Sequence, residues 1–407
     1  MIFASPIFLF WFLPVVLLVY YLLPMRRIET LDPIRPGSLA ALPAWICSKS
    51  GWLTIASFVF YAWWKPKYVP LMLVSALIDY YVGLALGNEQ RPTRRKLLLV
   101  VSCVTNLGLL GWFKYANLCV ASFGTVLGDA APPWVASWEA VVLPVGISFY
   151  TFQSMSYTID VYRRELHPIR NVGDFLCYVT LFPQLVAGPI VRYADVAAQI
   201  QDREHSSAKF ATGAFLFMTG FAKKILLADV VSPFANALFG VPAGDGGTTG
   251  ALAAPTVVES WVGTLAYTFQ IYFDFSGYSD MAIGLGLMFG FMFPPNFDAP
   301  YKSASVTEFW RRWHITLSTW LRDYLYVPLG GNRRGEGRTY FNLAATMLLG
   351  GLWHGASWTF LAWGAYQGFW LIVERAAGRK PLYASLPRVA QIALTFVLLI
   401  GAGLLMH

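Results

Sequence analysis

Uninterrupted apolar runs, each about as long as a bilayer crossing, recur along this chain of 407 residues. The first, PIFLFWFLPVVLLVYYLLP at residues 6–24, contains no charged residue. A helix of about 20 apolar residues is long enough to cross a membrane. Only 13% of the residues are charged, whereas a soluble domain has roughly 25%. The runs are continuous and lack the alternation of barrel strands, so we expect an all-α polytopic membrane protein.

The spans expected from these runs cover most of the chain. They lie near residues 6–23, 50–64, 68–86, 97–119, 139–161, 172–191, 211–231, 257–273 and 277–293, with more between 340 and 375 and a last one at 389–406. Helices are expected because a helix satisfies its own backbone groups in lipid. The prediction is a bundle of roughly ten transmembrane helices that forms a single integral membrane domain over residues 1–407.

Two stretches interrupt the regular pattern. LFPQLVAGPIVR at 181–192 carries Pro183 and Pro189 inside an apolar run. A re-entrant or broken helix is expected there, packed in protein or lining a cavity. FWRRWHITLSTWLRDYLYVPL at 309–329 is aromatic but too rich in arginine to cross lipid alone. It predicts an interfacial or re-entrant helix with its arginines toward the cytoplasmic surface.

The net charge of +8 comes from 30 basic and 22 acidic residues. The basic residues gather in the short loops after the first, third and fifth spans: Arg26, Arg27 and Arg35; Arg91, Arg94, Arg95 and Lys96; Arg163, Arg164 and Arg170. By the positive-inside rule these loops are cytoplasmic and the N-terminus lies outside. Because no basic stripe with interleaved aromatic residues is present, nucleic acid is not an expected partner. The first apolar run is followed by its charges and is not expected to be a cleaved signal.

His354 is a candidate catalytic residue, because it stands in the apolar stretch TMLLGGLWHGASWTFLAWGAYQG (346–368). An ionisable residue inside a membrane is costly and marks a functional site by default. The alternative is a neutral histidine hydrogen-bonded to a neighbouring helix. Gly350, Gly351 and Gly355 let helices approach closely and also leave room beside the imidazole for a substrate.

His314 is the second candidate, on the aromatic stretch. Ser318 lies one helical turn along and would share its face. The alternative for His314 is contact with lipid headgroups. The other three of the five histidines are expected to be surface residues without a special role: His167, His205 and His407.

General base catalysis is the chemistry that suits these histidines. No metal centre is expected, because HxxxH, HExxH and CxxC spacings are all absent. A nucleophile elbow and a Walker A loop are absent too. A histidine titrates near neutral pH, and as a base it could deprotonate a hydroxyl for attack on an activated acyl group.

Charged residues near the histidines supply further candidates. Arginine is well suited to phosphate, and the candidate groups for a phosphate-bearing acyl donor are Arg311, Arg312, Arg333 and Arg334. Asp274 and Asp280 could orient an imidazole or an arginine, as carboxylates do in triads. The alternative for both is an acid-rich helix N-terminus.

Two long strings resemble the membrane-bound O-acyltransferase superfamily, bacterial alginate O-acetyltransferase type. They are TEFWRRWHITLSTWLRDYLYVPLGGNRRG (307–335) and LLGGLWHGASWTFLAWG (348–364). Further matching strings bring the resemblance to most of the chain: FASPIFLFWFLPVVLLVYYLLP, FYAWWKPKYVPL, LPVGISFYTFQSMSYTIDVYR, LFPQLVAGPIVR and YFDFSGYSDMAIGLGLMFGF.

This resemblance implies a helical fold around a central tunnel that is entered from both membrane faces. It implies that His354 is the catalytic base and that His314 is the second polar position of the site. It further implies that cytosolic acetyl-CoA is the acyl donor, a substrate and not a tightly bound cofactor. The expected partners are membrane lipids, a periplasmic acetyltransferase and a polysaccharide synthesis and export complex.

The expected function is therefore an inner-membrane O-acetyltransferase serving an exported, alginate-like polysaccharide. Other acceptors in the same class are peptidoglycan and cellulose, and the acyl group could instead be D-alanyl. A multi-span transporter or a structural subunit of an export complex are the alternatives from other classes. Members of this type usually continue beyond the position of Phe396 with further membrane segments, so the chain is expected to be naturally short or truncated.

Overall fold

A computed structural model describes residues 1–23, 45–242 and 248–404 of the chain. The basic loop predicted after the first span, with Arg26, Arg27 and Arg35, lies outside the described residues, as does His407.

The chain divides into two compact units. The first comprises Met1–Ala214 and Ala282–Pro294, and the second comprises Phe215–Met281 and Pro295–His407. The single integral membrane domain expected from the sequence stays a prediction.

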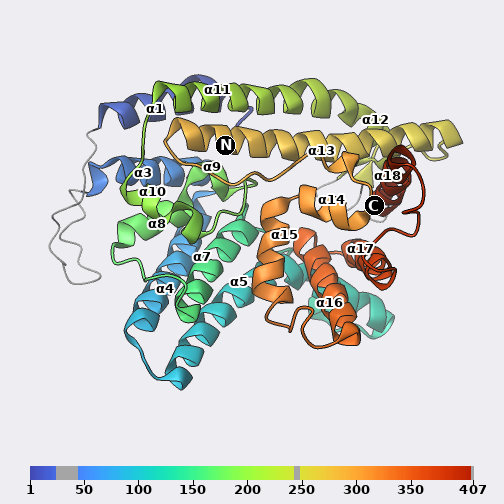
Figure 1. Ribbon diagram of the computed structural model, residues 1–407, viewed down its shortest axis with the longest axis horizontal. Helices are drawn as coiled ribbons and strands as arrows, with labels where there is room; N and C mark the ends of the chain where they lie inside the picture. Colours follow the sequence, from blue (N-terminus) through green and yellow to red (C-terminus); the bar gives the residue numbers. More distant parts are fainter. Residues whose placement is uncertain (24–44, 243–247, 405–407) are drawn as a thin grey trace. The chain divides into compact units, whose positions relative to one another are not determined.

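The first unit consists of helices and connecting segments (Figure 1). Its elements are η1 (Phe8–Phe12), α1 (Leu13–Leu22), α3 (Lys49–Ala62), η3 (Pro66–Tyr68), α4 (Val69–Asn88), α5 (Pro92–Leu127), η4 (Gly128–Ala130), α6 (Pro133–Ala136), α7 (Ile147–Arg163), α8 (Val172–Thr180), α9 (Phe182–Leu185) and α10 (Tyr193–Gln201). Two helices contribute residues to both units: α11 (Ser207–Ala222) and α13 (Val257–Met288).

The second unit is also helical, apart from one minimal antiparallel pair of strands in which Val241 faces Thr249. Its other elements are η5 (Lys223–Ala228), α12 (Asp229–Phe239), β1 (Val241–Pro242), β2 (Thr248–Thr249), η6 (Pro300–Lys302), α14 (Val306–Arg312), α15 (Ile315–Leu321), η7 (Arg322–Tyr326), α16 (Glu336–His354), α17 (Trp358–Ala376) and α18 (Arg388–Leu404). The expected helical class is confirmed.

Two helices among the described residues are long and apolar enough to cross a membrane: Pro66–Asn88 and Pro92–Ala130. Shorter apolar helices occur at Phe8–Leu22 and Arg388–Leu404. The count of roughly ten crossings is therefore not confirmed and stays a prediction.

The prediction of two spans at 257–273 and 277–293 is wrong, because α13 is one unbroken helix (Figure 1). The expected break lay between residues 273 and 277. In the second unit, however, Gly277 lies directly against the backbone of Gly220 on α11, and a side chain on either glycine would collide with the other's carbonyl. Both acids near the start of the second expected span, Asp274 and Asp280, lie inside this helix and are paired with lysines.

The interruption at 181–192 is confirmed as a broken helix. α8 ends at Thr180, α9 is a single short helical turn, and residues 186–192 are not helical. Phe182 of α9 packs against Phe60 of α3, with ring centroids 5.5 Å apart, and Phe3 lies 5.7 Å from Phe60. Aromatic packing thus holds the broken segment inside the first unit.

A buried polar network joins α4, α5 and α7 in the first unit. The carboxylate of Asp79, fully buried, accepts hydrogen bonds from Ser102 Oγ at 2.6 Å and from Asn106 Nδ2 at 2.7 Å. Ser102 Oγ also lies 2.9 Å from Thr158 Oγ1 on α7. A buried polar group is tolerated only when it is hydrogen-bonded, so these residues fix how the three helices align.

Arg95, predicted only as a topology-setting charge, also has a structural function. It is almost fully buried and donates to the carbonyls of Leu86, Val161 and Tyr162. These carbonyls belong to the C-terminal turns of α4 and α7, where a cation is favoured by the helix dipole.

We expect Asp79→Leu to destabilise the first unit, because one N–H of Asn106 would lose its buried acceptor and the Ser102 hydroxyl would keep only Thr158 Oγ1 as a partner. Each buried group left unsatisfied costs about 1–3 kcal/mol. Asp79→Asn is the matched control, since it retains an acceptor oxygen, and its loss should be smaller. Thermal unfolding in detergent micelles measures both. Equal stability of Asp79→Leu and the unchanged protein would show that the network does not stabilise the fold.

Candidate functional site

His314 lies at a break in the aromatic stretch, which the sequence predicted as one helix. α14 ends at Arg312 and α15 begins at Ile315, and His314 is the N-cap residue of α15. Its backbone is left-handed, with φ 41° and ψ 54°. This conformation is uncommon for a side chain with a Cβ, although histidine is enriched in it. The expected sharing of a helical face with Ser318 is therefore wrong, and Ser318 Oγ instead donates to the Trp313 carbonyl at 3.3 Å.

The strained turn is held by the segment that carries Asn296. Ile315 N–H donates to the Asn296 carbonyl at 2.9 Å, and Asp298 N–H donates to the Arg312 carbonyl at 2.9 Å. These two backbone hydrogen bonds lie on either side of His314. A strained backbone conformation persists where the surrounding structure holds it in place. Here one hydrogen bond before His314 and one after it, both to residues 296–298, hold the left-handed turn.

The Asn296 side chain adds a third attachment. Its Oδ1 lies 3.1 Å from His314 Nδ1 and accepts from Thr316 N–H at 3.3 Å and from Thr316 Oγ1 at 2.9 Å. Its Nδ2 donates to Ser279 Oγ on α13 at 2.9 Å. Asn296, His314 and Ser279 are all buried, so this network sets the position of the imidazole ring.

His354 is the last residue of α16, and its ring lies close to that of His314. The two ring centroids are 6.3 Å apart. His314 is fully buried, whereas His354 is half-buried. The second unit thus places side by side the two histidines predicted as catalytic.

Aromatic rings surround this imidazole pair. Phe275 of α13 meets the His314 ring edge-to-face at 4.7 Å, and Trp353 lies 6.0 Å from it. Trp363 of α17 lies 5.2 Å from the His354 ring. Such walls limit water around the rings and strengthen polar interactions inside the site.

The glycines beside His354 serve helix packing. A side chain on Gly351 would collide with the Phe360 carbonyl of α17, and one on Gly364 would collide with the Met347 carbonyl of α16. The space beside Gly355 is filled by the Phe360 ring. The expectation that Gly351 and Gly355 leave room for a substrate is therefore wrong, and the backbone contact between Gly351 and Gly364 holds α16, which ends at His354, against α17.

The N-terminus of α14 is held by carboxylates. Glu374 of α17, buried, accepts from the N–H groups of Val306 at 2.7 Å and Thr307 at 2.9 Å. Ser305 Oγ caps the helix by accepting from Glu308 N–H at 2.9 Å. Anionic groups are favoured at helix N-termini, so α14 is fixed at the end away from His314 as well.

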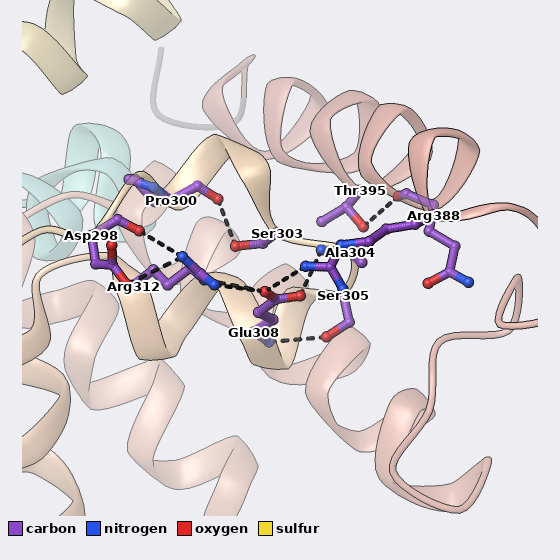
Figure 2. Close-up of polar contacts among 10 residues, drawn as sticks. Asp298, Pro300, Ser303, Ala304, Ser305, Glu308, Arg312, Arg388 and Thr395 are labelled. Atoms are coloured by element: carbon purple, nitrogen blue, oxygen red, sulfur yellow. Dashed lines mark hydrogen bonds and ion pairs between the residues drawn. The ribbon is translucent and has the colours of Figure 1, made fainter.

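Glu308 links α14 to its neighbours, as Figure 2 shows. It accepts from Ala304 N–H at 2.9 Å and pairs with Arg312 at 3.1 Å and with Arg388 of α18 at 3.4 Å. Burial alone would raise the pKa of Glu308, but the Ala304 N–H and the two guanidinium groups outweigh it. They hold the pKa of that carboxyl below its ordinary value.

The four arginines predicted for donor phosphates fall into two groups. Arg312 is paired with Glu308 and also with Asp298 at 3.1 Å, so its charge is already matched within the second unit. Arg311, Arg333 and Arg334 are exposed, and within the part of the chain that the structure describes no carboxylate pairs with them. A phosphate-binding role stays a prediction for all four.

Asp274 and Asp280 do not orient the imidazoles in this arrangement. Lys224 lies 2.7 Å from Asp274, and Lys223 lies 2.6 Å from Asp280. Both acids lie within α13, so the alternative of a helix N-terminus is also wrong. The group beside His314 is the amide of Asn296, which sequence reasoning missed. Its only signal was a polar residue in the Pro-rich turn PPNFDAP.

The remaining described histidines differ from each other. His167 is exposed, as expected. His205, expected to be a surface residue without a role, is half-buried, and its Nε2 lies 2.8 Å from Tyr20 Oη in the first unit. Among residues 1–23, 45–242 and 248–404, no group of three or more His, Cys, Asp or Glu side chains could hold a metal ion.

The sequence of residues 48–380 matches the family model described as MBOAT, membrane-bound O-acyltransferase family. This range contains both histidines and covers most of the chain. The chain belongs to the membrane-bound O-acyltransferase family. It is an acyltransferase, as the resemblance implied.

Three named proteins of this family are similar to the chain over most of its length. A protein of Azotobacter vinelandii named as a probable alginate O-acetylase is 48% identical over 92% of this chain and 69% of its own length. One of Pseudomonas aeruginosa with the same name is 47% identical over 93% of this chain and 66% of its own length. A Helicobacter pylori protein named peptidoglycan O-acetyltransferase is 36% identical over 97% of this chain and 75% of its own length.

We expect the ion pairs of Glu308 with Arg312 and Arg388 to contribute less to the free energy of unfolding at acidic pH. Because the folded pKa of Glu308 is lowered, its stabilisation is present above the ordinary glutamate pKa and is lost as pH falls through the folded pKa. Partly exposed ion pairs contribute up to about 1 kcal/mol, so the pH-dependent loss should be of this size. Glu308→Gln should remove it. The free energy of unfolding, measured from about pH 6 to pH 3 for both proteins, tests this. An identical acid-induced loss in Glu308→Gln would contradict it.

Proposed function

We propose that this chain is an inner-membrane O-acetyltransferase that moves acetyl groups from cytosolic acetyl-CoA toward the hydroxyl groups of an exported, alginate-like polysaccharide. The observation that carries the proposal is the imidazole pair, His314 and His354, 6.3 Å apart between aromatic rings. It lies inside the region that matches the family. The relatives named as alginate O-acetylases support the acetyl group and the type of acceptor.

The imidazole pair would act as the general base. As the acceptor oxygen attacks the thioester carbonyl, its O–H bond breaks and the proton goes to a ring nitrogen of the pair. His354 is half-buried and His314 is fully buried, so His354 is the ring that we propose meets the acceptor hydroxyl. The new C–O bond forms, the C–S bond breaks, and the thiolate of coenzyme A leaves and takes up the proton. Transfer is direct in this scheme, without an acyl group held on the protein.

The proposed arrangement in the membrane follows the charge pattern of the loops. The protein would cross the inner membrane several times with its N-terminus in the periplasm. Arg311, Arg333 and Arg334 would meet the phosphates of the donor from the cytosolic side. A periplasmic acetyltransferase and the polysaccharide synthesis and export complex would be its partners, in contact with membrane lipids.

Peptidoglycan is the second candidate acceptor. It is favoured by the Helicobacter pylori relative, which is 36% identical over almost all of this chain. Release of coenzyme A from acetyl-CoA, stimulated either by mannuronate oligosaccharides or by peptidoglycan fragments, distinguishes the two acceptors. No thioester turnover with either acceptor, in membranes that also contain the periplasmic partner, would favour a transporter or a structural subunit.

We expect His354→Ala to abolish acetylation at unchanged protein level in the membrane. A positioned base contributes about 10²–10⁴ in rate, so the loss should be at least 10²-fold. The ester content of the exported polymer and the rate of coenzyme A release both measure it. His167→Ala, which removes an exposed histidine from the first unit, should leave both unchanged. Normal acetylation by His354→Ala would refute the catalytic assignment.

We expect the double variant Arg333→Gln/Arg334→Gln to raise the KM for acetyl-CoA and to leave kcat unchanged, because the lost groups bind the donor without touching the thioester. A hydrogen bond to a charged group contributes about 1.5–3 kcal/mol, which corresponds to roughly a tenfold or larger rise. Lys380→Gln, an exposed cation outside this loop, is the control. Steady-state kinetics of coenzyme A release give both constants. An unchanged KM would remove these arginines from the donor site.

A further inference from the structure

The orientation of the Asn296 amide is determined by its neighbours. Its Oδ1 lies 3.3 Å from the Thr316 backbone nitrogen, and a backbone N–H only donates. Oδ1 is therefore the oxygen, as an acceptor is required there. Nδ2 faces Ser279 Oγ at 2.9 Å, which accepts its hydrogen.

This orientation determines the tautomer of His314. The same Oδ1 lies 3.1 Å from His314 Nδ1. Because Oδ1 has no hydrogen to give, Nδ1 is the donor and carries the proton. In the neutral imidazole the lone pair is then on Nε2. This nitrogen is buried and, within the described residues, no hydrogen-bond partner meets it.

We propose that Asn296 is a positioning residue, which holds His314 in the tautomer with its lone pair on Nε2 and so makes that nitrogen a proton acceptor at the acyl-transfer site. This inference rests on the proposed function for its catalytic meaning. The opposite tautomer would present an N–H at Nε2, and this nitrogen could not take up the proton that the acceptor hydroxyl loses.

The backbone conformation of His314 and the hydrogen bonds around it also hold the imidazole ring in one position. His314 adopts a left-handed conformation between two hydrogen bonds to the 296–298 segment. A left-handed backbone is strained for a residue with a Cβ, and such strain gathers at functional sites. The clamp aims Nδ1 at Asn296 and leaves Nε2 on the other side of the ring.

An amide in this place orients the ring without adding a charge. The residues that pack against His314 bring one titratable group among the described residues, His354 of α16; the others are aromatic or amide side chains, Phe275, Trp353, Phe297 and Asn296. The nearby acids of α13, Asp274 and Asp280, are paired with lysines. The ring is therefore neutral before a substrate proton arrives, which a base requires.

Two substitutions of Asn296 distinguish a role in positioning the His314 ring from a role in fold stability alone. Asn296→Leu removes the acceptor, and we expect kcat to fall roughly 10²-fold, the lower end of what a positioned base contributes, with the KM for acetyl-CoA unchanged. Asn296→Asp keeps an acceptor oxygen and should recover most of kcat. Its carboxylate favours the imidazolium, so the acid limb of the kcat profile should move to higher pH. Asn106→Leu, which removes a buried asparagine from the first unit, is the matched control for stability and should not shift this profile.

The tautomer itself is measured by ¹⁵N NMR of histidine-labelled protein in detergent micelles, with His314→Gln to assign the resonance. We expect His314 to show a protonated Nδ1 and an unprotonated Nε2 in the unchanged protein and in Asn296→Asp, and to lose this preference in Asn296→Leu. A protonated Nε2 in the unchanged protein, or an unaltered tautomer and kcat in Asn296→Leu, would overturn the proposal. The expected tautomer in a protein without acetyl transfer would overturn the proposed function and leave the positioning by Asn296 intact.

Discussion

The hydrogen bonds between Asn296 and residues 314–316 are the interaction on which the candidate site depends. They turn the chain at His314 into a left-handed conformation, separate α14 from α15, and present the imidazole to the end of α16. His314 therefore lies beside His354 and does not share a helical face with Ser318.

The rest of the second unit supports this geometry through matched polar groups. Glu374 and Glu308 hold the start of α14, while Lys223 and Lys224 pair with the two acids inside α13. Asp79 follows the same rule in the first unit, with hydroxyl and amide donors in place of a cation. A mostly apolar chain tolerates these groups because each one has a partner.

The two imidazole rings of His314 and His354 lie inside the region that matches the acyltransferase family. Two histidines forty positions apart in sequence are neighbours in the second unit, His314 at the break between α14 and α15 and His354 at the end of α16. The family assigns acyl transfer to the chain, and its relatives are named as alginate O-acetylases and a peptidoglycan O-acetyltransferase. The amide beside His314 adds a physical reason why this ring could act as a base and not as a donor.

The sequence by itself determined the helical class, the family and the broken helix at 181–192, because apolar runs, prolines and long motifs are local signals. It also singled out His314 and His354 as candidates, and their catalytic role stays a prediction. It did not reveal that α13 is continuous, that Arg312 is neutralised by Glu308 and Asp298, or that Asn296 orients His314. These features depend on which side chains of different helices contact each other. The residues adjacent in sequence do not reveal those contacts. Only the tertiary structure decided them, because a buried charge or amide takes the conformation that satisfies its hydrogen bonds.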